Sequence, residues 1–405
     1  MVAKNGPLEG VKVVELGTWV AVPAAGAILG DWGATVIKVE NVEGGDPLRG
    51  ARRIENIEIK DIHFLWELVN RNKRSIAIDI RKQQGQEILH KLIRDADVFM
   101  TNMVPGRSLT LGINYRSLTK FNSKLVYVLF TGFGENGPDR DKPGYDITAF
   151  WTRGGFMYRT VEPGSIPATQ PLSAGDQASS MFIAGAVSTA LFSREKTGKG
   201  QKISLSLYQN AAWVLAWELQ VVQSMNTELR WRYQDKAVNP LWNIYQTKDG
   251  RWIQLACLQS DRYWYPFCEA IEREDLKQDP RFNSDLKRTE NNGILISLIS
   301  ETFSKRTLEE WEKALRKHDI VYEKCQSISE IVNDPQALEN EFIVETKHPS
   351  GRVLKLVNSP VKFSGTPSSV RSTAPEYGQH TEEILLELGY SWDDIAKFKD
   401  QEAIP

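Results

Sequence analysis

Short apolar strands alternate with helical segments along the first third of the chain, and this alternation constrains the fold more than any other feature. Residues 11–16 and 35–40 are rich in Val, Ile and Leu, as is typical of buried strands, and a small-residue helix around 24–29 lies between them. The pattern returns with strands at 75–80, 97–101, 125–131 and 202–207 and an amphipathic helix at 84–94. The sequence therefore predicts an α/β fold with a doubly wound, Rossmann-like parallel sheet.

A different pattern begins at Trp242. Residues 242–247 and 252–257 are strand-like and flank Lys248-Asp249-Gly250-Arg251, a hairpin turn. Helical patterns at 262–271, 294–303 and 307–317 follow, which favours a second, smaller α+β domain. Strands at 352–356 and 361–364 and a helix at 381–388 come later, and we expect them to rejoin the large domain, which is then discontinuous. The large domain is expected over 1–206 and again over 351–405, and the small domain over 236–330. A linker helix (209–224) and a crossing lie within 207–235, and a return linker spans 331–350.

Composition narrows the class of protein. The 405 residues include 50 basic and 52 acidic side chains, so the net charge of −2 argues against nucleic acid as the main partner. The three cysteines form no CxxC pair or disulfide framework, and no stretch is apolar enough to span a membrane. These features predict a cytoplasmic protein without a membrane partner.

Gly175 and Asp176 stand where a loop rich in proline and serine meets a long segment of small and apolar residues. This pattern predicts a mostly buried helix with Asp176 in its cap or first turn. Most aspartates at such positions only cap the helix. The alternative is a carboxylate nucleophile on rigid backbone, which the N–H groups and the helix dipole keep ionised.

Other catalytic motifs are absent or poorly supported. One match to GxGxxG follows a strand, at Gly132-Phe133-Gly134-Glu135-Asn136-Gly137. The prolines and acids that come next are a poor helix start, which a dinucleotide site requires. We therefore expect a glycine loop beside an active site instead of a dinucleotide site. The five histidines show no metal-ligand spacing, and GxSxG, P-loop and HExxH motifs do not occur. A carboxylate is then the leading candidate nucleophile. Arg81 and Asn102 follow predicted strands and are placed for a phosphate-bearing ligand, although a solvated basic face explains Arg81 equally well.

Several motifs, in this order and spacing, resemble the family III CoA-transferases over nearly the whole chain. They are Pro7-Leu8-Glu9-Gly10, Gly33-Ala34-Thr35-Val36-Ile37-Lys38-Val39-Glu40, Gly45-Asp46-Pro47-Leu48-Arg49, Asn72-Lys73-Arg74-Ser75-Ile76, Gly175-Asp176, Thr197-Gly198-Lys199-Gly200-Gln201 and Gly378-Gln379-His380-Thr381. Asp141-Lys142-Pro143-Gly144-Tyr145-Asp146 is most similar to the members that act on 2-hydroxyisocaproate and phenyllactate.

The resemblance implies an enzyme that moves CoA from an acyl-CoA to a carboxylic acid. Asp176 would be the nucleophile and would pass through an anhydride and an aspartyl-CoA thioester. Implied CoA contacts are Trp19, Val20, Ala21, Ile78, Arg81, Asn102, Met103 and Arg107, the last in place of an arginine that this chain replaces with Thr110. The implied acid pocket has Tyr145, Gly132, Gly134 and Lys142. The CoA thioester is a co-substrate, no cofactor is held tightly, no metal is used, and the family forms interlocked homodimers.

Two alternatives remain open. One is an α-methylacyl-CoA racemase, although the histidine that such enzymes use as a base is Tyr145 here. The other is a non-catalytic subunit of a heteromer, which would have no need of Asp176. The aromatic and sulfur side chains expected near the pocket favour a bulky apolar or aromatic acid, but they fit a core or a dimer interface as well. The resemblance adds 2-hydroxy acids to these candidates. These side chains are Trp19, Trp151, Phe156, Met157, Trp213 and Trp217.

Overall fold

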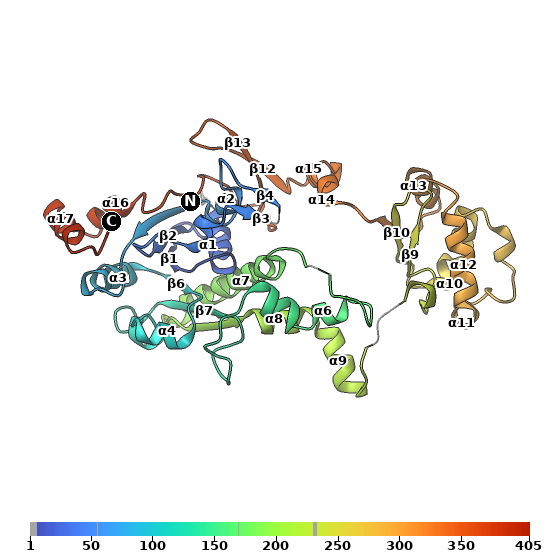
Figure 1. The fold of residues 1–405 in the computed structure, drawn as a ribbon, viewed down its shortest axis with the longest axis horizontal. Helices are drawn as coiled ribbons and strands as arrows, with labels where there is room; N and C mark the ends of the chain where they lie inside the picture. The colour runs from blue at the N-terminus through green and yellow to red at the C-terminus, as the bar shows by residue number, and fades with distance from the viewer. Residues whose placement is uncertain (1–5, 55, 169, 230–232) are drawn as a thin grey trace. The chain divides into compact units, whose positions relative to one another are not determined.

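The computed structural model describes residues 6–54, 56–168, 170–229 and 233–405. The chain forms two compact units, one from Met1–Leu229 together with Leu338–Pro405 and the other from Arg230–Ala337 (Figure 1). The large unit is therefore built from two separate stretches of sequence.

A parallel sheet of six strands forms the centre of the large unit, in the order β5-β2-β1-β6-β7-β8. This confirms the predicted α/β fold with a parallel sheet. The strands are β1 (Lys12–Leu16), β2 (Thr35–Glu40), β5 (Lys73–Ala77), β6 (Val98–Thr101), β7 (Val126–Thr131) and β8 (Lys202–Ser206). Strand order reverses between β1 and β6, and ligands bind at the carboxyl ends of strands beside such a reversal.

Helices cover both faces of this sheet. Side chains alternate along a strand, so Val14 points into one apolar core and Val13 into the other. The first core contains residues of α3, α16 and α17, and the second contains residues of α1, α7 and α8 (Figure 1). The longer helices of this unit are α1 (Ala21–Asp31), α2 (Phe64–Asn70), α3 (Gln83–Asp95), α7 (Ala174–Thr197), α8 (Leu207–Val214), α9 (Ala216–Met225), α16 (Thr381–Glu387) and α17 (Trp392–Asp400).

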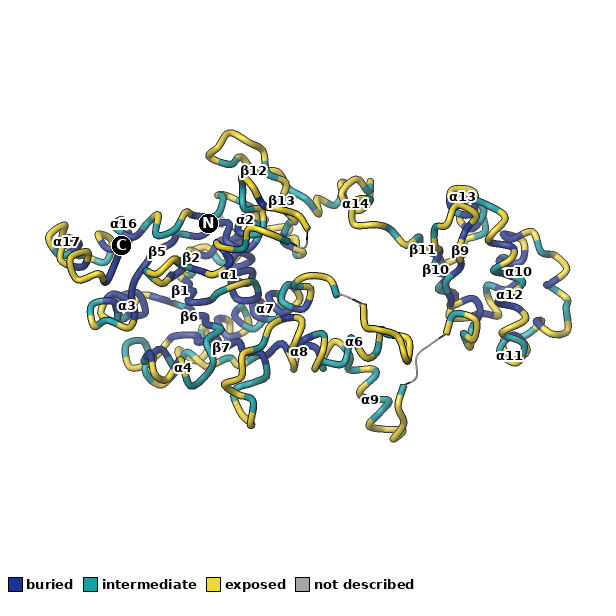
Figure 2. Tube along the Cα trace, viewed as in Figure 1, coloured by how far each residue is buried: buried dark blue, intermediate teal, exposed yellow. Residues whose placement is uncertain are grey.

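Shorter elements complete the large unit. They are η1 (Pro47–Gly50), β3 (Arg53–Ile54), β4 (Ile57–Glu58), α4 (Pro105–Thr110), α5 (Tyr115–Leu118), the π-helical turn η2 (Asp146–Thr152), α6 (Phe156–Arg159), β12 (Ile343–Lys347) and β13 (Val353–Val357). Burial differs sharply among its helices: all eleven residues of α1 are buried, and α9 has no buried residue (Figure 2).

The smaller unit has a three-stranded antiparallel sheet, β11-β10-β9, packed on helices around its own apolar core. The predicted hairpin over 248–251 is confirmed, because β9 pairs with β10 across it. Its elements are η3 (Gln234–Lys236), β9 (Ile244–Gln246), β10 (Trp252–Leu255), α10 (Ser260–Ala270), η4 (Glu274–Leu276), α11 (Asp285–Glu290), α12 (Asn292–Phe303), α13 (Leu308–Lys317), β11 (Tyr322–Lys324) and α14 (Ile328–Ile331), and α15 (Pro335–Glu339) spans the boundary to the large unit.

Three predicted elements differ from the structure. The helix expected over 209–224 is two helices, because the backbone leaves helical geometry at Leu215. Residues 361–364 form no strand; Val361 and Phe363 instead pack their side chains against the second core. The strand expected over 75–80 ends at Ala77, because the next residues turn toward the C-terminal segment, where the Asp79 N–H donates to the Ala403 carbonyl oxygen at 2.8 Å.

Within these described residues, no helix has the length and apolar character needed to cross a membrane.

Candidate active site

The loop after β1 lies at the point where the strand order reverses, and β6 is the neighbouring strand. Asn102, which follows β6, is hydrogen-bonded to this loop in both directions. Its Oδ1 accepts from the Thr18 N–H at 3.1 Å, and its Nδ2 donates to the Thr18 carbonyl oxygen at 2.8 Å. Asn102 therefore fixes the loop, and the phosphate contact expected of its side chain from the sequence would have to share the amide with Thr18.

Asp176 lies in the first turn of α7, which confirms its predicted place at a helix start. It is not the cap, however: Ser173 holds that position in a left-handed conformation with φ of 56°. Within the described part of the chain, no donor is hydrogen-bonded to the Asp176 carboxylate. The capping interpretation is therefore wrong, and this side chain is left available for chemistry.

A second carboxylate, Asp146, holds the start of α7. It is buried at the beginning of η2, where its Oδ1 accepts from the Asp176 N–H at 3.0 Å and its Oδ2 accepts from the indole N–H of Trp151 at 2.9 Å. Gly175 permits this approach, because a Cβ there would lie 2.3 Å from Asp146 Oδ1. In the sequence Asp146 is only part of a motif, and no local pattern indicates that this carboxylate positions Asp176.

Burial and then the negative charge of Asp146 raise the pKa of Asp176 to about 7. Burial and Asp146 thus oppose the ionisation that the N–H groups and dipole of the helix were expected to maintain. Burial also raises the pKa of Asp146, although the hydrogen bonds from Trp151 and from the α7 backbone oppose that rise. At neutral pH a large fraction of Asp176 is then ionised, and its carboxylate is more basic than an ordinary aspartate, which favours a nucleophilic role.

Asp176 lines a cavity at the carboxyl edge of the sheet, which we call the Asp176 cavity. It is bounded by the loop after β1, the start of α1 and the turns after β6 and β7. Its lining residues are Thr18, Trp19, Val20, Ala21, Asn102, Val104, Phe130, Thr131, Gly132, Pro143, Gly144, Tyr145, Asp176 and Leu207. Six residues predicted for binding from the sequence, Trp19, Val20, Ala21, Asn102, Gly132 and Tyr145, thus surround the predicted nucleophile.

Two glycines bring the cavity walls together. A Cβ on Gly132 would lie 2.6 Å from the Cα of Gly144, and a Cβ on Gly144 would lie 2.7 Å from the Cα of Gly132. The structure does not bring the other two residues of the predicted acid pocket to this cavity. Gly134 follows in the turn, where its N–H donates to Thr131 Oγ1 at 2.9 Å, and the Lys142 ammonium lies 5.3 Å from the centre of the Phe133 ring.

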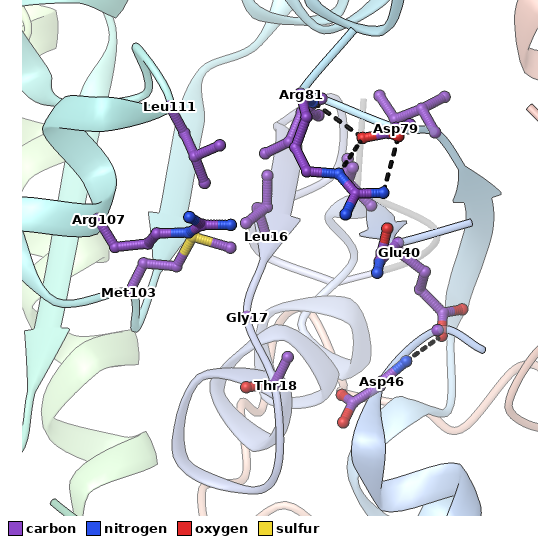
Figure 3. Close-up of a pocket in the computed structure, with 15 residues that line it drawn as sticks. Leu16, Gly17, Thr18, Glu40, Asp46, Asp79, Arg81, Met103, Arg107 and Leu111 are labelled. Atoms are coloured by element: carbon purple, nitrogen blue, oxygen red, sulfur yellow. Dashed lines mark hydrogen bonds and ion pairs between the residues drawn. The ribbon is translucent and has the colours of Figure 1, made fainter. Parts of the chain in front are cut away.

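A neighbouring cavity shares Thr18 with the first, and we call it the Arg107 cavity (Figure 3). Its lining residues are Leu16, Gly17, Thr18, Val39, Glu40, Asn41, Gly45, Asp46, Ile78, Asp79, Ile80, Arg81, Met103, Arg107 and Leu111. The structure thereby places the remaining predicted CoA contacts, Ile78, Arg81, Met103 and Arg107, around one space.

Arg81 and Arg107 differ in how they are held. The Arg81 guanidinium donates to Asp79 from Nε at 2.8 Å and from NH2 at 2.9 Å, and it also pairs with Glu43 at 2.7 Å. It belongs to the loop between β5 and α3 and does not directly follow the strand. Arg107, on α4, has no hydrogen-bonding or ion-pair partner for its guanidinium among the described residues. Figure 3 shows the two arginines on opposite sides of Leu16.

Aromatic side chains gather beside Asp176. Trp19 and Tyr145 meet edge to face with ring centres 6.2 Å apart, and both line the Asp176 cavity. Behind Asp146, the rings of Phe150 and Phe156 stack at 5.0 Å, with Trp151 against both. Trp213 and Trp217 line neither cavity; they are 71% and 87% exposed, so the interpretation of these two as core residues is wrong within this chain.

A carboxylate with a raised pKa thus lies at the carboxyl edge of a parallel sheet, next to a cavity that carries arginines, and this edge is where sheets of this kind bind their ligands. Comparison with known proteins gives the family. Residues 8–381 match the family model described as CoA-transferase family III, and the chain belongs to this family.

The relatives agree over almost their full lengths. An (R)-2-hydroxy-4-methylpentanoate CoA-transferase of Clostridioides difficile is 36% identical, covering 98% of this chain and 99% of the relative. A cinnamoyl-CoA:phenyllactate CoA-transferase of Clostridium sporogenes is 32% identical, with 98% and 97% covered. Among solved structures, a CAIB/BAIF family protein from Brucella suis superposes with a TM-score of 0.82 at 28% identity, covering 95% of this chain and all of that one. The family and the enzyme class predicted from sequence are thereby confirmed.

Proposed function

We propose that this protein transfers CoA from an acyl-CoA donor to a carboxylic acid, with Asp176 as the group that carries CoA between them. One observation carries the proposal. The Asp176 carboxylate has no hydrogen-bonded donor among the described residues, and its cavity adjoins, through Thr18, a second cavity lined by Arg81 and Arg107. A reactive carboxylate next to cationic side chains matches the two ends of an acyl-CoA, its thioester and its phosphates.

The proposed reaction uses only acyl exchange. An Asp176 oxygen attacks the thioester carbonyl, the C–S bond breaks, and CoA leaves as a thiolate from a mixed anhydride. The thiolate then attacks the Asp176 carbonyl carbon, which releases the donor acid and leaves aspartyl-CoA. The acceptor carboxylate attacks this thioester, which gives a second mixed anhydride and releases the CoA thiolate. The thiolate then attacks the carbonyl carbon of the acceptor, which gives the new acyl-CoA and free Asp176. No water, oxidant or net proton is consumed.

The lining residues suggest separate roles in holding CoA, which is a co-substrate here and not a tightly bound cofactor. Arg107 and Arg81 would contact phosphates, and Ile78 and Met103 would supply apolar surface beside them. Trp19, Val20 and Ala21 line the path toward Asp176, and Asn102 would act mainly by fixing that path through Thr18. Backbone N–H groups of the glycine turn at Gly132 are candidates for stabilising each tetrahedral oxyanion.

The acceptor is proposed to be a bulky apolar, aromatic or 2-hydroxy acid. Support comes from Trp19 and Tyr145, whose rings line the Asp176 cavity, and from relatives named for 2-hydroxy-4-methylpentanoate and phenyllactate. Tyr145 would contact the acyl group directly. Gly134 and Lys142 remain predictions without a place in this cavity.

The test measures CoA transfer from a panel of acyl-CoA donors to a panel of carboxylic acids and then traps the covalent intermediate. Wild-type protein incubated with an accepted donor and then hydroxylamine should be modified at Asp176, as read by peptide mass spectrometry, with Asp176→Asn as the matched blank. Adduct on another residue would overturn the nucleophile. Epimerisation of a 2-methylacyl-CoA without transfer would indicate a racemase, and an inert chain that works only with a second subunit would indicate the non-catalytic alternative.

Assembly and location complete the proposal. An interlocked homodimer is supported by the large unit being built from two separate stretches of chain, and it should stay dimeric on strong dilution in size-exclusion chromatography with light scattering. A monomer that grows in on dilution would contradict it. A cytoplasmic location is supported by the three cysteines, which are all free.

A further inference from the structure

A cluster of buried charges lies on the α1 face of the sheet, beneath the loop that joins the two cavities. Glu15 on β1 and Lys38 on β2 are registered partners in the parallel ladder, and both are fully buried. Asp46 and Lys73 are also buried beside them. We call these four residues the Lys38 network; it holds two positive and two negative side chains.

Three oxygen atoms surround the Lys38 ammonium. The Lys38 Nζ lies 3.0 Å from Glu15 Oε1, 2.9 Å from Asp46 Oδ2 and 2.8 Å from the carbonyl oxygen of Gly17. Burial lowers the pKa of Lys38, but the carboxylates of Glu15 and Asp46 outweigh it and keep the net shift upward. The ammonium therefore stays charged and ties the two acids to the loop backbone.

The acids extend the network in two directions. Asp46 Oδ1 accepts from the Trp19 N–H at 3.1 Å and from the Leu48 N–H at 3.0 Å. Glu15 Oε2 pairs with Lys73 at 2.7 Å, and Lys73 also donates to the Pro23 carbonyl oxygen. Gly26 in α1 makes room for this carboxylate, because a Cβ there would lie 2.0 Å from Glu15 Oε2.

The loop itself needs such support. Trp19 has φ of 66°, a left-handed conformation that is unfavourable for a non-glycine residue. Four successive polar groups of the loop backbone are bound by side chains: the Gly17 carbonyl by Lys38, both Thr18 groups by Asn102, and the Trp19 N–H by Asp46. Thr18 lines both cavities, so the loop is their common wall.

Stability alone does not explain these charges. Desolvating four ionic groups offsets most of their mutual attraction, and apolar side chains of similar volume commonly give an equally stable protein. What apolar side chains cannot do is bind a carbonyl and an N–H of a strained loop. We propose that the Lys38 network acts as a set of positioning residues that fix residues 17–19, and thereby set how an acyl-CoA passes from the Arg107 cavity to Asp176.

This inference rests on the proposed function, and its test separates the two. The variants are Lys38→Met, which keeps the length of the side chain and removes its charge, and Asp46→Asn, which keeps an oxygen for the Trp19 N–H. The matched control is Arg71→Met. Arg71 forms a buried ion pair with Asp31 at 2.8 Å, in the same unit, and lines neither cavity.

Two measurements are made on each folded variant well below its melting temperature. Hydrogen–deuterium exchange should speed up at least about tenfold in peptides covering residues 17–20 for Lys38→Met, less for Asp46→Asn, and not at all for Arg71→Met. Steady-state transfer should show kcat reduced about tenfold or more by Lys38→Met, with Arg71→Met within twofold of the wild type.

Each outcome decides the matter. Loop exchange unchanged in Lys38→Met, or changed equally in Arg71→Met, would overturn the proposal. Faster loop exchange with unchanged kcat would show that the network fixes the loop but that the loop does not affect catalysis. This result would also overturn the proposal. If Lys38→Met does not fold, the same readings on Asp46→Asn decide in its place. If wild-type protein transfers no CoA at all, the proposed function fails, and the exchange result still shows whether the network holds the loop.

Discussion

Two carboxylates lie near the same loop, Asp46 buried and Asp176 half-buried, and their surroundings are opposite. Asp46 has the Lys38 ammonium at 2.9 Å and two backbone N–H donors. Asp176 has no cation and no hydrogen-bonded donor among the described residues, and its near neighbour is another acid, Asp146. With these partners, Asp46 holds the backbone in place. Without such partners, Asp176 has its pKa raised to about 7 and is left free to react. The predictions below test this contrast, from the largest expected effect to the smallest.

Asp176→Asn should reduce CoA transfer by at least about a thousandfold, because an amide oxygen cannot serve as the nucleophile. Folding should survive. The pKa of Asp176 is raised in the folded state, so its stabilising effect falls as pH rises from about 4 to about 7. The variant should therefore melt no lower than wild type above pH 7, as measured by calorimetry. A rate within tenfold of wild type would assign the nucleophile elsewhere.

The pH dependence of the wild-type enzyme should show an acid limb near pH 7. In the proposed mechanism only the ionised carboxylate attacks, so kcat/KM should fall about tenfold per pH unit below that value and reach a plateau above it. A profile that stays flat down to pH 5 would mean that Asp176 keeps an ordinary aspartate pKa and that its burial has little effect on its charge.

Asp146→Asn should lower kcat by about tenfold and leave the KM for the acyl-CoA nearly unchanged. Both Asp146 oxygens accept hydrogen bonds, one from Asp176 N–H and one from Trp151, so an amide must turn its NH2 toward one of these donors. Removing its charge should also move the acid limb of the pH profile to lower pH, because Asp146 raises the pKa of Asp176. A limb that stays in place would show that burial alone sets that pKa.

Arg107→Ala and Arg81→Ala should both raise the KM for every acyl-CoA donor, with kcat little changed, because a phosphate contact is made equally in the ground and transition states. We expect about tenfold for Arg107, which is unpaired within the described residues, and less for Arg81, which must first give up contacts to Asp79 and Glu43. An effect confined to the acceptor acid would mean that the Arg107 cavity does not hold the nucleotide.

Much of the fold could be predicted because its signals are local. Most strands of the central sheet are short segments rich in Val, Ile, Leu or Phe, and Asp176 stands at a visible change from loop to helix. The role of Asp146 could not be read in this way, since it depends on η2 meeting the start of α7 thirty positions later in the chain. The break at Leu215 also has no local signal, as no proline or glycine lies near it.

Part of the Lys38 network is visible in the sequence. Glu15 and Lys38 are opposite charges inside two strands expected to be buried, and adjacent parallel strands can bring such residues into register. What no local pattern contains is the third acceptor, the Gly17 carbonyl, or the room left by Gly26. The pairing could be anticipated from the sequence; its connection to the loop required the tertiary structure.

The turn after β5 has a consequence for how the protein is made. The Asp79 N–H binds the carbonyl oxygen of Ala403, and Lys82 donates to the carbonyl oxygen of Gln401, so this turn is completed by residues more than three hundred positions later. The same turn carries Arg81. While a ribosome is still translating the chain, the wall of the Arg107 cavity therefore lacks these contacts, and the nascent protein cannot complete this wall until residue 403 has emerged from the exit tunnel.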